Sequence, residues 1–137
     1  MFPGYVFGRN ELVLDAAAMQ TQNSSNNFAM VGMQGGNLPF PIHGGFVHID
    51  DLADFHLHVL FLEPKAGVVE DFALAAKVDY GEIFDHVEKA FPKAVESGIF
   101  NRGNIPTLPI AYDSSDAEKM LGRKLKGFSS AITDVAE

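Results

Sequence analysis

The sequence predicts a mixed α/β fold with an incomplete parallel sheet. Segments with strand-like patterns alternate with segments of helical spacing, which is the order found in crossover architectures. Residues 72–76 (Phe-Ala-Leu-Ala-Ala) are apolar on both faces, as expected of a strand buried in a parallel sheet. Only two or three short strands are indicated, and these cannot cover one another. We therefore expect residues 1–137 to belong to a larger fold or to pack against a partner.

The segment before residue 45 is expected to be helical at its start and irregular afterwards. Residues 12–19 have helical spacing, and Asn10 is placed to cap that helix. The polar run 20–27 and the glycine-rich run 32–36 are both expected to be loops, because they combine residues that favour turns.

A strand followed directly by a helix is predicted next. Residues 46–49 form the strand, Asp51 is expected to cap the helix, and Pro64 is expected to end it. The buried stripe of this helix is predicted from apolar residues at helical spacing, namely Leu52, Phe55, Val59 and Leu62.

The second half of the chain repeats the alternation. We expect a strand over 68–76 that includes the apolar run, a short strand over 107–111 and a final helix from residue 128 to 136. Two further helices are expected between them. The first is capped by the pair Asp79 and Glu82 and ends at Pro92, and its apolar face is formed by Ile83, Val87 and Ala90. The second spans 117–121, is capped by Ser115 with Glu118 and is closed by Gly122.

Composition limits the classes of function. The chain has 137 residues, of which 47% are hydrophobic and 20% charged, the balance of one folded domain. No apolar run reaches membrane-spanning length and the start does not resemble a secretory leader, so we expect a cytoplasmic protein with no membrane partner. The absence of cysteine excludes disulfides, thiolate metal sites and cysteine nucleophiles. A net charge of −8 argues against a nucleic-acid partner.

Charge is distributed unevenly along the chain. Arg9 is the only basic residue in residues 1–64, which are rich in glycine, phenylalanine, methionine and proline. A segment with so few charges is expected to be covered by other protein, since bare apolar surface indicates an interface or a tendency to aggregate. All the other basic residues lie in 65–137, which is expected to form an ordinary solvated exterior.

The histidines allow one metal hypothesis. His48 and Asp50 form a His-x-Asp pair, and with a distant histidine such as His86 they have the ligand types of an Fe(II)-binding facial triad. A capping role explains Asp50 better, because it opens a helix. His56 and His58 are two residues apart on that helix, so one is expected in the core and the other near solvent. We therefore predict no metal ligands and keep a small Fe(II) enzyme as a third hypothesis.

Other polar motifs favour structural roles. The glycine-rich run 32–36 precedes Asn-Leu-Pro-Phe-Pro at 37–41, which cannot open the helix that a phosphate site requires. The carboxylate pairs at 50–51 and 70–71 indicate helix capping and a solvated strand start. The basic trio Arg123, Lys124 and Lys126 follows a helix end, where the helix dipole favours cations, and a bound phosphate there is the less favoured alternative.

Three blocks, taken in order, resemble one family. They are Pro-Gly-Tyr-Val-Phe-Gly at 3–8, Gly-Phe-Val-His-Ile-Asp-Asp-Leu-Ala-Asp-Phe-His at 45–56, and Tyr-Asp-Ser-Ser-Asp-Ala-Glu-Lys-Met-Leu-Gly at 112–122. The trio is similar to the C-terminal part of extended short-chain dehydrogenases/reductases, also called the NAD-dependent epimerase/dehydratase family. The branch that it resembles contains dihydroflavonol reductases and aldehyde or ketone reductases. The resemblance spans essentially the whole chain but only about the C-terminal half of the family's length.

The resemblance implies a Rossmann-type fold and a set of roles. Residues 1–137 would be the C-terminal substrate-binding portion of an NAD(P)-dependent oxidoreductase, with the N-terminal dinucleotide-binding part absent. Pro3, Gly4, Tyr5 and Val6 match the family segment that runs beside the nicotinamide and the substrate, so they are the implied cofactor-binding residues. Residues 12–41 match the variable region that lines the substrate pocket. The implied cofactor is NADP or NAD, and the implied substrate is a small carbonyl compound.

Two family features are missing from this sequence. There is no glycine-rich dinucleotide fingerprint, and none of Tyr5, Tyr80 and Tyr112 is followed four residues later by lysine. The family's Tyr-x-x-x-Lys pair supplies the catalytic proton, so no catalytic residue is assigned here and the isolated chain is expected to be inactive and to hold the cofactor only weakly. The alternative function is a non-catalytic interaction module that pairs with an intact homologue or with a chain that supplies the N-terminal half.

Overall fold

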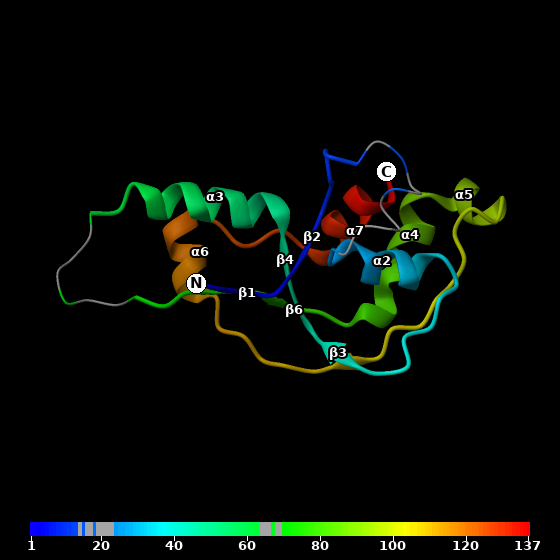
Figure 1. Ribbon diagram of the computed structural model, residues 1–137, viewed down its shortest axis with the longest axis horizontal. Coiled ribbons are helices and arrows are strands. Elements are labelled where there is room, and N and C mark those ends of the chain that lie inside the picture. The colour runs from blue at the N-terminus through cyan, green and yellow to red at the C-terminus, as the bar shows by residue number, and fades with distance from the viewer. Residues whose placement is uncertain (14, 16–17, 19–23, 64–66, 68–69) are drawn as a thin grey trace.

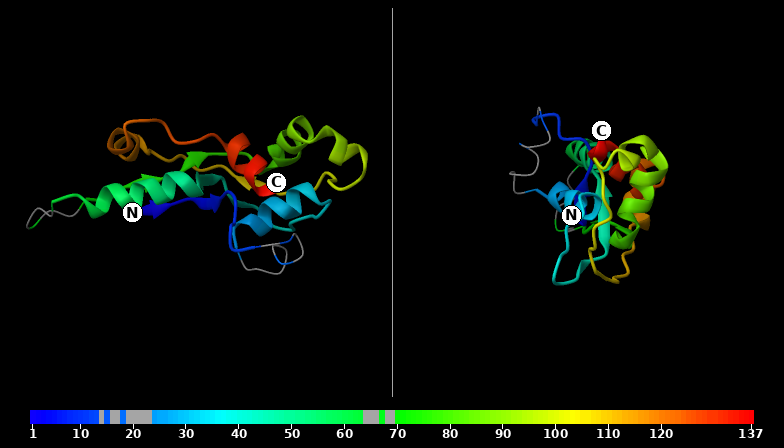
Figure 2. Two further views of the ribbon diagram at one scale, coloured as in Figure 1. Left: turned by 90° about the horizontal axis from the view of Figure 1, so that it is seen from above. Right: turned by 90° about the vertical axis from the view of Figure 1, so that its right-hand side faces the viewer.

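The computed structural model describes residues 1–13, 15, 18, 24–63, 67 and 70–137. The molecule is elongated, with short strands at its centre and helices toward both ends (Figures 1 and 2). The expected helix at 12–19 falls largely on residues outside this description. The next helix, expected to end at Pro64, ends earlier, at Leu60, and Pro64 itself lies outside the described residues. Within the described residues, no helix is long and apolar enough to cross a membrane.

In the described part of the chain, seven short strands form small sheets that are mostly parallel. β1 pairs with β5, β2 with β4, and β3 with β7, all in parallel, whereas β6 pairs with β4 in the antiparallel direction. The mixed α/β class with small parallel sheets is therefore confirmed. The strands are β1 (Phe2–Pro3), β2 (Tyr5–Phe7), β3 (Ile42–His43), β4 (Gly45–His48), β5 (Ala73–Leu74), β6 (Ala76–Lys77) and β7 (Thr107–Leu108).

Six α-helices and one short 3₁₀-helix are described around these strands. The α-helices are α2 (Asn26–Met33), α3 (Ile49–Leu60), α4 (Ile83–Ala90), α5 (Pro92–Glu96), α6 (Ser115–Leu121) and α7 (Phe128–Ala136), and the 3₁₀-helix η1 (Tyr80–Glu82) precedes α4. α3 and α6 pack together at one end of the molecule, while α2, α4 and α7 pack together toward the other (Figure 1).

Strand β4 divides two hydrophobic cores. It is buried along its whole length between β2 and β6, and its successive side chains point to opposite faces. Phe46 joins the larger core with α2, α4 and α7, where its ring lies 4.9 Å from that of Phe128. Val47 joins the smaller core with Phe55 of α3 and Leu74 of β5. Because alternate side chains of β4 point into different cores, this strand connects the packing at the two ends of the molecule.

The predicted strands occur at the expected positions, but their bounds and pairing differ from the prediction. The expected strand 46–49 is β4, which starts one residue earlier and ends before Ile49. The expected single strand 68–76 is replaced, within its described part, by β5 and β6, which pair with different partners in different directions. Ala75 lies between these two strands, and both its N–H and its carbonyl bond to the Ser114 hydroxyl, so a side chain interrupts the ladder there. The expected strand 107–111 is only β7.

The largest error of the sequence prediction concerns α2. The polar run 20–27 was expected to be a loop throughout, but Asn26 and Asn27 begin this helix, and Gly32 lies in its last turn. A Cβ atom on Gly32 would lie 3.0 Å from side-chain carbons of Ile83 in α4, so the glycine permits close helix packing. Tertiary packing therefore stabilises a helix that local propensity does not predict.

Helix α3 also differs from its prediction. Its cap is His48, whose Nδ1 accepts the Asp50 N–H at 3.1 Å, and not Asp51, which is fully buried. Phe55 is buried as expected, but Val59 and Leu62 are 42% and 45% exposed, because the far end of α3 extends beyond the body of the molecule (Figure 2).

Smaller differences concern the later helices. Ala90 is exposed and does not belong to the apolar face of α4, while Ile83, Phe84 and Val87 are buried. Pro92 does mark the end of that helix, but it also opens α5. Helix α6 begins at Ser115, and the preceding Ser114 directs its hydroxyl to Ala75 instead of capping. Gly122 closes α6 in the left-handed conformation, with φ of 67°, and α7 spans the residues expected.

Candidate functional site

Strand β2 and the two residues before it hold the implied cofactor-binding segment. Pro3 ends β1, Gly4 connects the strands, and Tyr5 and Val6 lie in β2, paired with Phe46 and Val47 of β4. The backbones approach closely at this point, because a Cβ atom on Gly4 would lie 2.7 Å from the carbonyl carbon of Gly45. Glycine at position 4 is therefore required for β1 to continue into β2 against β4.

A small hollow of about 260 Å³ opens beside this segment. Its wall at Gly45 is formed by the ring of Tyr112, which would lie 2.3 Å from a Cβ atom on that glycine. Buried Tyr80 fixes the backbone behind the wall, since its hydroxyl lies 3.1 Å from the carbonyl oxygens of His43 and Gly45. Burial raises the pKa of the Tyr80 phenol, which keeps it protonated as a donor. The lining residues are Pro3, Gly4, Tyr5, Ser25, His43, Gly45 and Tyr112.

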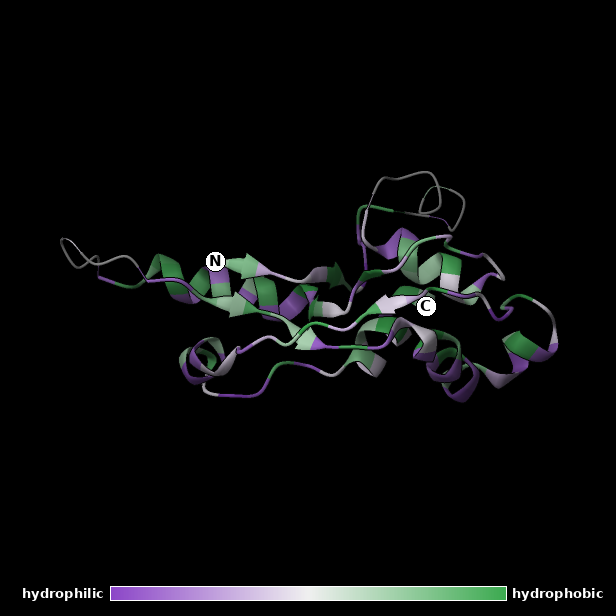
Figure 3. Ribbon diagram, turned by 90° about the horizontal axis from the view of Figure 1, so that it is seen from below, coloured by the Kyte–Doolittle hydropathy of each residue, from purple (hydrophilic) through white to green (hydrophobic). Residues whose placement is uncertain are grey.

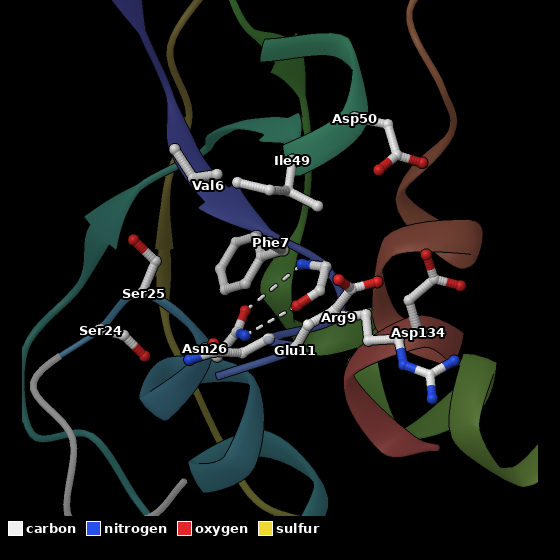
Figure 4. A pocket seen from close by; sticks show the side chains of 12 residues that line it. Val6, Phe7, Arg9, Glu11, Ser24, Ser25, Asn26, Ile49, Asp50 and Asp134 are labelled. Carbon is white, nitrogen blue, oxygen red and sulfur yellow. Dashed lines mark hydrogen bonds between the residues drawn. The ribbon is translucent and has the colours of Figure 1, made fainter. Parts of the chain in front are cut away.

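A larger hollow of about 830 Å³ begins where β2 ends (Figure 4). This volume lies in the range of pockets that hold drug-sized ligands. Val6, Phe7 and Ile49 provide apolar lining, Ser24 and Ser25 lie on one side, and the carboxylates of Asp50 and Asp134 lie on the other (Figure 4). The remaining lining residues are Gly8, Arg9, Asn10, Glu11 and Asn26.

Just after the end of β2, the side-chain amide of Asn26 forms two hydrogen bonds with the backbone of Gly8. Asn26, at the start of α2, donates its side-chain N–H to the Gly8 carbonyl at 2.8 Å and accepts the Gly8 N–H at 3.4 Å (Figure 4). Gly8 has φ of 145°, a conformation that disfavours other residues, so the chain can turn away from β4 here. The turn leaves the space that the larger hollow occupies.

His48 and Lys126 bond to the two carboxylates of the larger hollow, Asp134 and Asp50. His48 is fully buried and its Nε2 lies 3.0 Å from Asp134 of α7. Because Nδ1 accepts the Asp50 N–H, the ring carries its hydrogen on Nε2, and this N–H donates a hydrogen bond to Asp134. The Lys126 ammonium, 2.5 Å from the Asp50 carboxylate, donates a hydrogen bond to it and holds the pKa of Asp50 below its ordinary value.

Ser25 is the residue that sequence reasoning missed. It lines both hollows and therefore lies between them beside β2. It stands in a polar run with no distinguishing pattern, and only the fold brings it next to Pro3, Gly4 and Tyr5. The signal that could have indicated it was the expectation that residues 12–41 match a substrate-lining region.

The metal hypothesis finds no support in the geometry. Among the described residues, no group of three or more histidine, aspartate or glutamate side chains is placed to hold a metal ion. Both ring nitrogens of His48 are engaged by protein groups, and His86 instead packs 5.7 Å from the ring of Phe128. His56 and His58, of which one was expected in the core, are both exposed and bond to backbone carbonyls of their own helix.

The basic trio is occupied by carboxylates of the chain itself. Arg123 bonds to Asp51 and Asp54, while Lys126 bonds to Asp50. Lys124 bonds to Glu118 at 2.6 Å. The contacts of Arg123 and Lys126 connect the segment after α6 to the start of α3, and that of Lys124 connects it to α6 itself. The trio therefore has a structural role, and the phosphate alternative has no support.

The chain is similar in sequence to known enzymes. The chain is 31% identical to the NAD-dependent epimerase/dehydratase ALT6 of Alternaria alternata over 96% of its own length and 40% of that protein's. It is 31% identical to the NAD-dependent epimerase/dehydratase FUM13 of Gibberella moniliformis over 98% of the chain and 38% of that protein. It is 29% identical to the ketoreductase CTB6 of Cercospora beticola over its full length and 40% of that protein. No family model matches the chain.

Solved structures agree on the fold. The yeast methylglyoxal/isovaleraldehyde reductase Gre2, determined with NADPH, aligns with a TM-score of 0.65 at 22% identity over 96% of this chain and 43% of that one. Gre2 from Candida albicans aligns with a TM-score of 0.68 at 16% identity, over 96% of this chain and 40% of that one.

The comparisons therefore show distant homology to the extended short-chain dehydrogenases/reductases. The chain is a distant homologue of the NAD-dependent epimerase/dehydratases and of the Gre2 and ketoreductase type, and it corresponds to their C-terminal part. It spans about two fifths of the length of the curated relatives that it matches. The resemblance stated from the sequence is confirmed.

Proposed function

We propose that this chain is the substrate-binding, C-terminal portion of an NAD(P)-dependent carbonyl reductase in the cytoplasm. In this role Pro3, Gly4, Tyr5 and Val6 contact the nicotinamide end of NADP or NAD, and the larger hollow holds a small carbonyl substrate. Residues 1–137 then form one functional unit, and the dinucleotide-binding unit is supplied by another part of the enzyme.

One observation carries the proposal: the Pro3–Val6 segment lies between a small and a large hollow that share Ser25. A reductase must bring its cofactor and its substrate into contact, because the hydride passes directly between them. Two hollows that share one lining residue beside a single strand would suit that arrangement. The ketoreductase and NADPH-bound reductase among the similar proteins support the same reaction class.

The chain's own residues would bind and orient the reactants. Apolar Val6 and Ile49 would contact the carbon skeleton of the substrate, while the Ser25 hydroxyl can donate to an oxygen of the substrate or of the cofactor. When bound, the cofactor would supply the hydride. No described tyrosine stands in a Tyr-x-x-x-Lys pair, so the proton of the reaction would come from the dinucleotide-binding unit.

Measuring both binding and turnover tests this proposal. The pure chain is expected to show no oxidation of NADPH, followed by absorbance, with a panel of aldehydes and ketones. Joined in one polypeptide to the residues that precede the matched segment in the Alternaria relative, it is expected to bind NADPH and to reduce members of the panel.

Substitution at the junction of the hollows sharpens the test. Ser25→Val in the joined protein is expected to lower kcat/KM about fivefold to thirtyfold, since a lost hydrogen bond to a bound group costs roughly 1–2 kcal/mol. Ser129→Val is the matched control and should leave kcat/KM unchanged, because Ser129 is exposed and lines neither hollow. Clear turnover by the 137-residue chain alone, or equal effects of the two substitutions, would contradict the proposal.

A second candidate is a non-catalytic module that pairs with an intact homologue. The exposed apolar side chains at the far end of α3 favour some partner, because Leu60 and Phe61 are 74% and 84% exposed. Co-purification with a full-length relative that lowers neither its NADPH binding nor its turnover would support this role. A clean monomer that binds no hydrophobic dye would count against it.

A further inference from the structure

The larger hollow contains one carboxylate that a buried side chain holds in place, that of Asp134 in α7. The Asp134 side chain is 34% exposed, and its Oδ2 lies 3.0 Å from Nε2 of the fully buried His48. Within the described part of the chain, no group bonds to the other oxygen, Oδ1. The His48 N–H thus orients the carboxylate and leaves Oδ1 able to accept a hydrogen bond from a ligand.

The negative charge of Asp134 does not stabilise its own helix. Helix α7 ends at Ala136, so Asp134 lies in the last turn, where the helix dipole disfavours a carboxylate. An asparagine carbonyl could accept the His48 N–H equally well without carrying a charge. Neither the helix nor the bond to His48 therefore requires a charge at this position.

The lining of the larger hollow carries more negative than positive charge. Lys126 compensates Asp50 at 2.5 Å, whereas no described lysine or arginine forms an ion pair with Asp134. The other charged lining residues are Glu11 and Arg9, so two uncompensated carboxylates stand against one base. The resulting potential favours neutral ligands over anions.

The opposite wall of the hollow adds hydroxyl groups to this arrangement. Ser24 and Ser25 lie across the hollow from Asp134 (Figure 4), and the buried Ser24 hydroxyl has no hydrogen-bond partner among the described residues. Val6 and Ile49 provide apolar lining. Hydrophobic and hydrophilic segments, green and purple in Figure 3, both lie around the C-terminus, where α7 ends. The hollow is therefore suited to a ligand with an apolar skeleton and polar substituents.

Resting on the function proposed above, we propose that the larger hollow selects carbonyl substrates that also carry a hydroxyl group and discriminates against keto acids. The substrate hydroxyl donates to Oδ1 of Asp134, a charged acceptor, which makes this hydrogen bond stronger than one between neutral groups. A keto acid presents a carboxylate in place of the donor, so it loses the hydrogen bond and meets a like charge. Asp134 is thus the residue that determines specificity, and His48 positions it.

Three ligands with one skeleton test the proposal on the pure 137-residue chain, without cofactor. Phenacyl alcohol carries the hydroxyl, its methyl ether lacks the donor, and benzoylformate carries a carboxylate instead. Titrations followed by NMR of the ligand signals at neutral pH give the three dissociation constants. Phenacyl alcohol is expected to bind at least about fivefold more tightly than either of the other two.

Substitution of Asp134 should reverse this preference. Asp134→Asn keeps an acceptor for His48 but presents an amide N–H to the hollow, so it is expected to weaken phenacyl alcohol about fivefold and to strengthen benzoylformate. Glu96→Gln is the matched control, because Glu96 is exposed on α5 and lines neither hollow, and it should leave all three constants unchanged. Circular dichroism checks that the variants are folded, and the comparison of ligands on the parent chain depends on no variant.

Several results would overturn the proposal. They are no detectable binding of phenacyl alcohol, equal affinity for its methyl ether, tighter binding of benzoylformate that Arg9→Gln abolishes, and equal effects of Asp134→Asn and Glu11→Gln. Turnover by the joined protein reports on the proposed function separately. Turnover without a preference for the hydroxyl would refute this inference alone, and the preference without turnover would refute the proposed function alone.

Discussion

Replacing Arg123 with glutamine is expected to destabilise the chain far more than replacing Arg102 with glutamine, although both arginines bond to an aspartate. Arg102 lies 2.5 Å from Asp85, and both side chains are more than half exposed. Arg123 bonds to Asp51, whose side chain is fully buried at the start of α3. The comparison therefore contrasts an arginine bound to a buried carboxylate with one bound to an exposed carboxylate.

The magnitude follows from that burial. Removing one partner of a buried ion pair costs about 3–5 kcal/mol, because the other charge is left without compensation. Here the Arg123 side chain is 37% exposed and the Lys126 N–H still bonds to Asp51 at 2.6 Å, so the lower end applies. We expect a loss of about 3 kcal/mol in the free energy of unfolding. Arg102→Gln should cost about 1 kcal/mol, including the loss of its contact with the Phe84 ring.

Urea unfolding followed by circular dichroism measures both losses, with the slope m showing whether the denatured state has changed. Asp51→Asn in the Arg123→Gln background is expected to recover part of the loss, because it removes the uncompensated charge and leaves an acceptor for Lys126. If Arg123→Gln costs no more than Arg102→Gln, or if Asp51→Asn makes it worse, burial of the charge is not what makes this contact important.

Two further predictions concern packing and pH. Gly103→Ala is expected to lower the free energy of unfolding by more than about 2 kcal/mol, since its Cβ would lie 2.1 Å from the Val31 carbonyl oxygen. Gly127→Ala should lower it by less than about 1 kcal/mol, because nothing lies within 4 Å of its Cβ. Thermal unfolding compares the two variants, and similar losses would refute the steric reason. Lys126 lowers the pKa of Asp50 below its ordinary 3.8, so the stabilisation by this pair is present above about pH 4 and is lost as the pH falls through the lowered value. Stability measured from pH 6 to pH 2 should decline less in Lys126→Met than in the parent, and identical declines would contradict the assignment.

The parts of the fold that the sequence predicted are those in which local pattern and tertiary packing agree. The end of α6 was found because Gly122 takes a conformation that favours glycine, and α7 because its apolar residues recur at helical spacing. Helix α2 was missed because its signal is tertiary: Asn26 bonds to Gly8, and Gly32 packs on Ile83, both distant in sequence.

The candidate site divides in the same way. Pro3, Gly4, Tyr5 and Val6 came from a resemblance of short blocks, and the structure places them beside two hollows, although their contact with a cofactor stays a prediction. Ser25 could not be selected from the polar run around it, because nothing local distinguishes it from Ser24. The stripe predicted on α3 was correct for Phe55 and wrong for Val59, because helical spacing identifies apolar positions but not which of them the rest of the chain reaches.

The sequence by itself determined the α/β class, the ancestry and the missing catalytic pair, since these depend on residue identity and on order along the chain. Only the tertiary structure decided that His48 bonds to Asp134, that Asp51 lies buried against Arg123, and that Leu57, Val59 and Leu60 of α3 are exposed. Contacts between distant residues depend on how the strands pair and the helices cross, and no local pattern records that geometry.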